Sequence, residues 1–121
     1  MLSDEREITN LMSRYSRALD DIDMDLLRSI LREDFRFEGG GYLVEGRDEV
    51  IAMMAADLPR GGKHQYFNTE MSIDGDSASV DADWIWLDSS HAIAHAGRFT
   101  ADFAKVGGNW LYARRWATIT D

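Results

Sequence analysis

Cysteine is absent from this chain of 121 residues, so disulfides, thiolate nucleophiles and cysteine zinc sites are excluded. No apolar run approaches the roughly 20 residues that a transmembrane helix needs, and no signal-like segment opens the chain. Basic residues are scarce: 13 lysines and arginines stand against 22 aspartates and glutamates, a formal net charge of −9. Because nucleic acids and anionic lipids bind to basic surfaces, we expect neither as a partner. We expect a cytoplasmic location.

Apolar and aromatic residues are plentiful. Hydrophobic residues make up 45% of the chain, which contains 4 tryptophans, 4 tyrosines and 5 phenylalanines. A chain of this length and composition can bury one core, and it contains no internal repeat, linker or low-complexity stretch. The sequence therefore predicts a single domain over residues 1–121.

The first half of the chain predicts helices. Apolar residues recur at three- and four-residue steps after Ser3, a suitable N-cap: Ile8, Leu11, Met12, Tyr15, Leu19 and Ile22. A second helix is expected after Asp23, and a third over 47–58, ended by the chain's one proline. Between them, "FRFEGGGYLVEG" predicts a short strand pair around three glycines.

The second half predicts an antiparallel meander. Residues 63–74, 77–88, 91–106 and 109–120 are rich in strand-forming residues, and "DGD", "DSS" and "VGGN" separate them as tight turns would. In the second of these strands, alternation places Trp84 and Trp86 on one face and Asp81 and Asp83 on the other. The pattern indicates an α+β domain with helices on one face of a curved sheet.

Five segments, taken in order, resemble the nuclear-transport-factor-2-like, or SnoaL-like, superfamily: "YSRALDDIDMDLL", "REDFRFEG", "EGRDEVIAMM", "KHQYFN" and "GGNW". The resemblance runs from about Glu5 to Ile119. It implies a cone-shaped barrel, with three N-terminal helices packed in a strongly curved, mostly antiparallel sheet that encloses a pocket. Because this fold serves enzymes, binding modules and assembly subunits, it does not fix the function.

The pattern is most similar to the branch of scytalone dehydratase and bile-acid 7α-dehydratase. Those enzymes pair a carboxylate near the end of the first helix with a histidine on the first long strand. The matching positions are Asp20 and His64. The resemblance also implies Tyr15 as a catalytic tyrosine and Asp88, after one inserted residue, as a further acid.

These four residues suit the elimination of water without a metal or cofactor. A histidine exchanges protons near neutral pH, and a buried carboxylate would fix its tautomer. Tyr15 could donate a hydrogen bond to a carbonyl oxygen, and His64 or Asp88 could protonate the departing hydroxyl. We therefore predict a small-molecule lyase of the dehydratase type.

Six further residues are predicted to bind the substrate: Tyr66, Asn68, Trp84, Trp86, His95 and Phe99. Tyr66 and Asn68 share the strand parity of His64, and the tryptophans share a face of the next strand. An aromatic pocket with few polar groups suits a small hydrophobic or cyclic organic substrate, such as a cyclic hydroxy-ketone.

Other polar residues have ordinary explanations. His91 and His95 are four residues apart, which on a strand leaves them two pleats apart and without a third ligand, so no metal site is predicted. Arg98, Arg114 and Arg115 are expected to pair with surplus acids on the surface.

The four catalytic candidates have structural alternatives as well. Asp20 could cap a helix, Tyr15 could belong to the core, and Asp88 could begin a turn. His64 could be a partly exposed strand residue. On a regular helix Tyr15 and Asp20 are also about 140° apart, so they converge only if Asp20 lies near the helix end.

The resemblance to each enzyme is incomplete. The functional arginine of the bile-acid enzyme corresponds to Ile119, and the serine and asparagine of scytalone dehydratase correspond to Gly97 and Phe99. The base of ketosteroid isomerases falls near Gly39, beside Glu38, which leaves an isomerase as an alternative. A binding protein without chemistry and a structural subunit, like the small subunits of ring-hydroxylating dioxygenases, remain alternatives too.

The outer face of the sheet suggests self-association. Ile85 and Leu87 lie opposite the tryptophan face and would be exposed in a monomer. We expect a homodimer or homotrimer that buries them.

Overall fold

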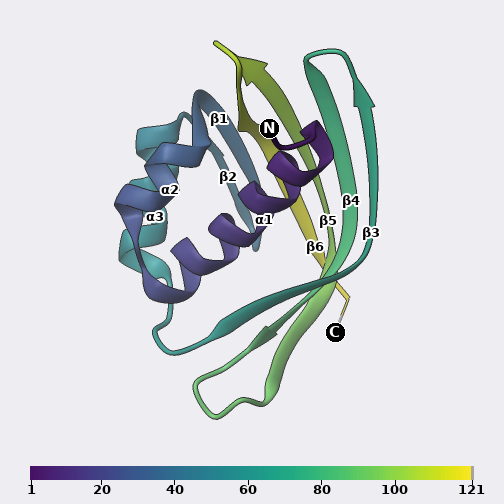
Figure 1. The fold of residues 1–121 in the computed structure, drawn as a ribbon. Coiled ribbons are helices and arrows are strands. Elements are labelled where there is room, and N and C mark those ends of the chain that lie inside the picture. Colours follow the sequence, from purple (N-terminus) through teal and green to yellow (C-terminus); the bar gives the residue numbers. More distant parts are fainter. Residues whose placement is uncertain (121) are drawn as a thin grey trace.

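A computed structural model describes residues 1–120. Its elements are α1 (Asp4–Asp21), α2 (Met24–Ile30), β1 (Leu31–Gly39), β2 (Tyr42–Glu45), α3 (Arg47–Asp57), β3 (Lys63–Asp74), β4 (Ser77–Leu87), β5 (Ile93–Val106) and β6 (Asn109–Ile119). The strands of the described residues form one sheet in the order β2-β1-β6-β5-β4-β3, in which the β1–β6 pair is parallel and the other pairs are antiparallel. The three helices lie against one side of this curved, unclosed sheet (Figure 1). The predicted α+β class is confirmed.

Helix α1 forms for the reasons that its sequence predicts. The Ser3 side chain accepts a hydrogen bond from the Arg6 backbone N–H, and acids fill the first turn. The helix ends at Ile22, whose left-handed conformation (φ 51°) lets its N–H bond to carbonyls of the last turn. Asp23 then caps α2 by accepting from the Leu26 N–H.

Two irregularities in the strands decide which side chains face inward. In β3 the register shifts between Phe67 and Glu70, and Asn68 has a positive φ of 54°. In β6 the pairing with β5 shifts between Tyr112 and Arg114. Since each irregularity reverses the alternation of side chains, simple parity holds on only one side of it.

The aromatic core lies between α1 and the sheet. Tyr112 is fully buried, and its ring lies 4.9 Å from that of Tyr15, 6.2 Å from Phe35 and 4.4 Å from Phe103. Such ring pairs add to the hydrophobic stabilisation of the core.

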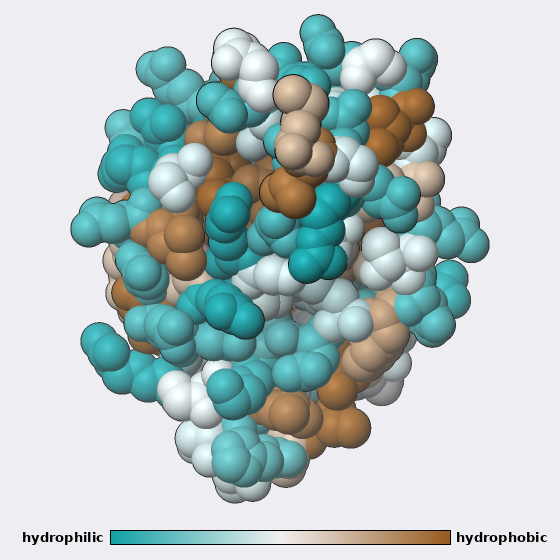
Figure 2. Space-filling view, viewed as in Figure 1, coloured by the Kyte–Doolittle hydropathy of each residue, from teal (hydrophilic) through white to brown (hydrophobic). Residues whose placement is uncertain are grey.

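Polar side chains cover most of the face seen in Figure 2, with hydrophobic patches between them. Within residues 1–120, no helix has the length and apolar character to cross a membrane.

Candidate functional site

A cavity of about 240 Å³ lies between the last turns of α1, helix α3, and strands β4 and β6. Most of its wall is apolar: Leu19, Phe37, Met53, Met54, Leu58, Trp84, Ala117 and Ile119. Tyr15, His64 and Arg115 contribute polar groups from three different elements. An apolar hollow with a few convergent polar groups is the usual form of a small-molecule site.

A second hollow of about 360 Å³ adjoins the cavity and shares several of its wall residues, including His64 and Trp84. It adds Asp20, Trp86 and His95 to the lining. A larger groove of about 910 Å³ runs along the outside between α1 and β3. Its lining is mostly polar and exposed, so we regard the smaller, more apolar cavity as the candidate site.

Asp20 and His64 are in direct contact at the edge of this cavity. Nδ1 of His64 lies 2.7 Å from Oδ1 of Asp20, and the backbone N–H of His64 donates to the same oxygen at 2.9 Å. Their side chains are only 16% and 14% exposed for His64 and Asp20. A carboxylate can only accept, so Nδ1 carries the proton and Nε2 is left as an acceptor.

The contact joins the two halves of the fold. Asp20 lies in the last turn of α1, and His64 is the second residue of β3, the edge strand. Tyr15 and Asp20, which are far apart around the helix, do not need to converge, because their side chains point in different directions. Tyr15 faces the cavity, whereas Asp20 reaches β3 beside it.

Electrostatics favour the neutral imidazole. Burial lowers the pKa of His64, the hydrogen bond and charge of Asp20 raise it, and the positive charge of Arg115 lowers it again. The net result is a pKa below the ordinary value of 6.5. His64 is therefore unprotonated at neutral pH and able to accept a proton at Nε2.

Tyr15 offers an unused donor. Its side chain is completely buried, and within residues 1–120 its hydroxyl has no hydrogen-bond partner. Burial raises the pKa of Tyr15 well above its ordinary value, although the charge of Arg115 opposes this. The phenol therefore keeps its proton and can donate a hydrogen bond to an acceptor in the cavity.

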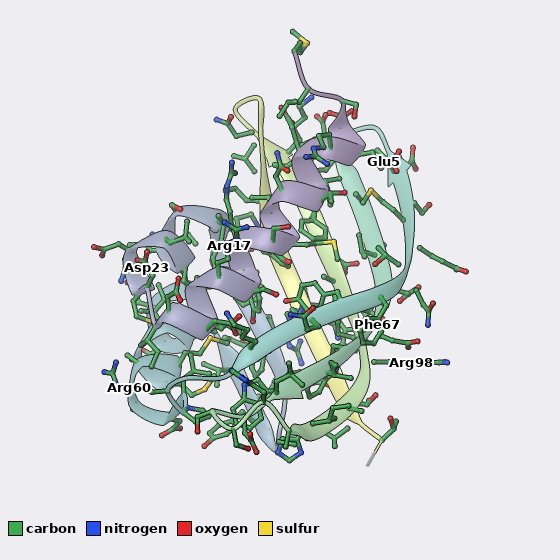
Figure 3. The ribbon with its side chains drawn as sticks, turned by 60° about the horizontal axis from the view of Figure 1, so that its bottom comes forward. Glu5, Arg17, Asp23, Arg60, Phe67 and Arg98 are labelled. Atoms are coloured by element: carbon green, nitrogen blue, oxygen red, sulfur yellow. The ribbon has the colours of Figure 1, made fainter. Side chains whose placement is uncertain are left out.

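The structure places Asp88 and Asn68 outside the lining of the 240 Å³ cavity. Oδ1 of Asp88 accepts from the backbone N–H and hydroxyl of Ser90, at 2.9 and 2.6 Å, and from the Ala92 N–H at 3.1 Å. Asp88 therefore holds a turn and does not line the cavity. Asn68 is exposed and donates to Asp83, because the β3 irregularity turns it to the outer face, where Arg98 also points into solvent (Figure 3).

The remaining predicted binding residues are on the inner face. Trp84 lines both hollows, and its Nε1 has no partner among the described residues. Trp86 and His95 line the second hollow with their rings stacked 5.9 Å apart. Tyr66 and Phe99 form a ring pair at 4.9 Å, but neither lines the 240 Å³ cavity.

Arg115 is the residue that sequence reasoning missed. It is only 4% exposed, so the expectation of surface pairing is wrong for it. Its guanidinium lies 3.9 Å from the ring centre of Phe99, 4.5 Å from Tyr15 and 5.5 Å from Tyr66. Consecutive arginines on a strand must point to opposite faces, a signal that one of Arg114 and Arg115 is inward. The β6 irregularity makes it Arg115.

Residues 1–120 contain no group of three or more histidine, aspartate or glutamate side chains placed to hold a metal ion. His91, one of the pair considered above, is exposed in the turn before β5.

Several solved structures share this fold. A protein with a cystatin-like fold from Nostoc punctiforme superposes with a TM-score of 0.90 at 21% identity, over 97% of this chain and 91% of that one. A proposed scytalone dehydratase from Novosphingobium aromaticivorans gives 0.83 at 22% identity, over 98% and 85%. A proposed dehydratase of the NTF2-like family from Streptomyces avermitilis gives 0.81 at 17% identity, over 96% and 95%. At these identities the likeness establishes the fold alone.

No curated protein matches the chain in sequence. The family model of the SnoaL-like domain, however, matches residues 1–116. With this match and the observed architecture, the chain belongs to the SnoaL-like domain family.

Proposed function

We infer that this protein is a small-molecule lyase that eliminates water from its substrate without a cofactor. The observation that carries the inference is the 2.7 Å contact between Asp20 and the Nδ1 of His64 beside an apolar cavity. It provides an oriented, neutral base in a water-poor place, as abstraction of a proton next to a carbonyl requires.

The steps follow from the positions of the donors and acceptors. Nε2 of His64 removes a proton from the carbon next to a carbonyl, and Tyr15 donates a hydrogen bond to the carbonyl oxygen as negative charge develops. Asp20 stabilises the imidazolium. The electron pair then forms the double bond, the carbon–oxygen bond to the hydroxyl breaks, and the imidazolium proton leaves with that hydroxyl as water.

The cavity limits the substrate. Its volume of about 240 Å³ is below the roughly 300–1,000 Å³ of ordinary ligand pockets, and its wall is mostly apolar. A compact substrate with a single ring, a hydroxyl and a carbonyl is the class we propose.

An isomerase is less favoured by the geometry. Glu38, the acid nearest the position of an isomerase base, pairs with Arg36 at 3.5 Å and does not line the cavity. The alternative of a binding protein without chemistry would use the same cavity, and the assay below distinguishes it from an enzyme.

The test is turnover of single-ring β-hydroxy-ketones by the purified protein, followed through the absorbance of the conjugated product. His64→Ala should reduce the rate by about 10²–10⁴-fold, because it removes the base. His91→Asn is the matched control, since His91 is an exposed histidine away from the cavity, and it should retain full activity. Turnover that survives in His64→Ala excludes this mechanism. Saturable binding without product identifies a binding protein.

A further inference from the structure

A positive charge is buried beside the cavity, and the described residues offer it no negative partner. Arg115 is 4% exposed and lines the cavity, and the part of the chain that the structure describes gives it no ion pair. Its Nη1 has no hydrogen-bond partner within residues 1–120. The rings of Tyr15, Tyr66 and Phe99 lie against the guanidinium but carry no negative charge. A buried charge without a counter-ion is unfavourable, so the arrangement indicates a missing anion.

The neighbouring polar groups are donors too. Tyr15 and Trp84 also line the cavity, and the Tyr15 hydroxyl and Trp84 Nε1 are buried and unpartnered among the described residues. Two carboxylates lie nearby, but neither forms an ion pair with Arg115. Asp57, at the exposed rim, accepts from the Tyr42 hydroxyl at 2.9 Å, and Asp20 is bonded to His64.

We propose that the ligand of this cavity carries a carboxylate, which binds to Arg115 with Tyr15 or Trp84 as a second donor. The guanidinium is charged before any reaction begins, so its partner must be an anion in the bound ground state. A transient enolate would not satisfy this requirement. A carboxylate matches a guanidinium and a neighbouring donor with its two oxygens. The binding of a carboxylate does not depend on the proposed function. The inference rests on that function only where it takes the ligand to be the substrate, which would then be a single-ring hydroxy-keto acid.

The test compares benzoate with benzamide, which has nearly the same shape and no charge, by calorimetric titration of the full chain. Benzoate should bind the wild-type protein at least about tenfold more tightly, as the loss of a charge-assisted bond predicts. Equal affinities, or no binding of benzoate at millimolar concentration, would overturn the proposal.

Variants then locate the anion. Arg115→Met should abolish the preference for benzoate and leave the thermal midpoint of the unliganded protein unchanged or higher, because it removes an unpaired buried charge. A merely structural Arg115 would show the reverse: a lower midpoint with the preference intact. Arg115→Lys, which keeps the charge, should retain part of the preference if Arg115→Met does not fold.

Two controls separate this proposal from the lyase mechanism. Arg98→Met removes an arginine whose side chain is 79% exposed on the outer face, and it should bind benzoate as the wild type does (Figure 3). His64→Ala should lose turnover and still prefer benzoate. Loss of the preference in Arg98→Met contradicts a site at Arg115, whereas an intact preference in a protein without turnover overturns the lyase alone.

Discussion

Tyr15 shows how a single residue can serve the site at a cost to the fold. Among the residues that the structure describes, its buried hydroxyl has no partner, so it loses the hydrogen bonds that it would make in water. The hydroxyl of Tyr112 in the core is likewise buried and has no partner among the described residues, but Tyr112 does not line the cavity. The pair therefore allows function and stability to be separated.

We predict that Tyr15→Phe reduces the elimination rate by about 10²-fold, because it removes a donor to the developing oxyanion. The free energy of unfolding should stay the same or rise. Tyr112→Phe should have the same effect on stability in a denaturant titration and none on the rate. A rate loss of equal size in both variants would show that Tyr15 acts only through the core.

The pH dependence of the reaction tests the state of His64. Its pKa lies below 6.5, mainly because it is buried, so the activity should fall on the acid side with a midpoint below 6.5. Asp20→Asn removes the negative charge that raises this pKa. We predict that this variant moves the midpoint to still lower pH and lowers the plateau rate about tenfold or more. An unchanged midpoint would exclude His64 as the titrating group.

The same shift has a consequence for stability. Between the folded pKa and 6.5, the unfolded chain binds the proton more readily than the folded one. The contribution of neutral His64 is therefore present above pH 6.5 and is lost as the pH falls through the folded pKa. Thermal midpoints of the wild type should drop over this interval, and those of His64→Ala should drop less.

At the scale of elements, β5 and β6 approach closely at Gly97. A Cβ there would lie 1.8 Å from the carbonyl oxygen of Thr118 and 3.0 Å from Nε1 of Trp84. We predict that Gly97→Ala lowers the free energy of unfolding by about 1–3 kcal/mol, since β6 must move. Gly39→Ala is the matched control, because its Cβ would meet only ordinary contacts at 3.4 Å. Equal stability of the two variants in urea titrations would contradict this account.

The helices and strands show which parts of the structure the sequence could predict. The apolar stripe of α1 and the turn residues of the meander predicted the helix and strand positions, because local periodicity determines them. The Asp20–His64 proximity came from a family resemblance, since no periodicity relates a helix end to a distant strand. The position of Asn68 differs from the prediction because the irregularity in β3 reverses the alternation, and no sequence pattern marks it. Arg115 differs because consecutive arginines on one strand cannot both face solvent, and the irregularity in β6 decides which of them lies inside.

For the whole molecule, self-association remains a prediction. Ile85 and Leu87 are partly buried in the single chain, whereas nearby Phe67 and Ile93 are 42% and 65% exposed. We predict a homodimer or homotrimer at micromolar concentration by light scattering. Ile85→Lys should shift it toward the monomer, because an ammonium group cannot be buried in an apolar interface without cost. Ala52→Lys, on the exposed surface of α3, is the control.

The proposed base lies on strand β3 and its carboxylate on helix α1. This separation determines how the protein should lose its activity on heating. Detachment of the last turn of α1 would strip the imidazole of its partner while the hydrogen bonds of the sheet stayed intact. Such partial openings require less free energy than complete unfolding. On heating, inactivation should therefore come before melting, and hydrogen exchange should show amides near Ala18 opening earlier than those of β5.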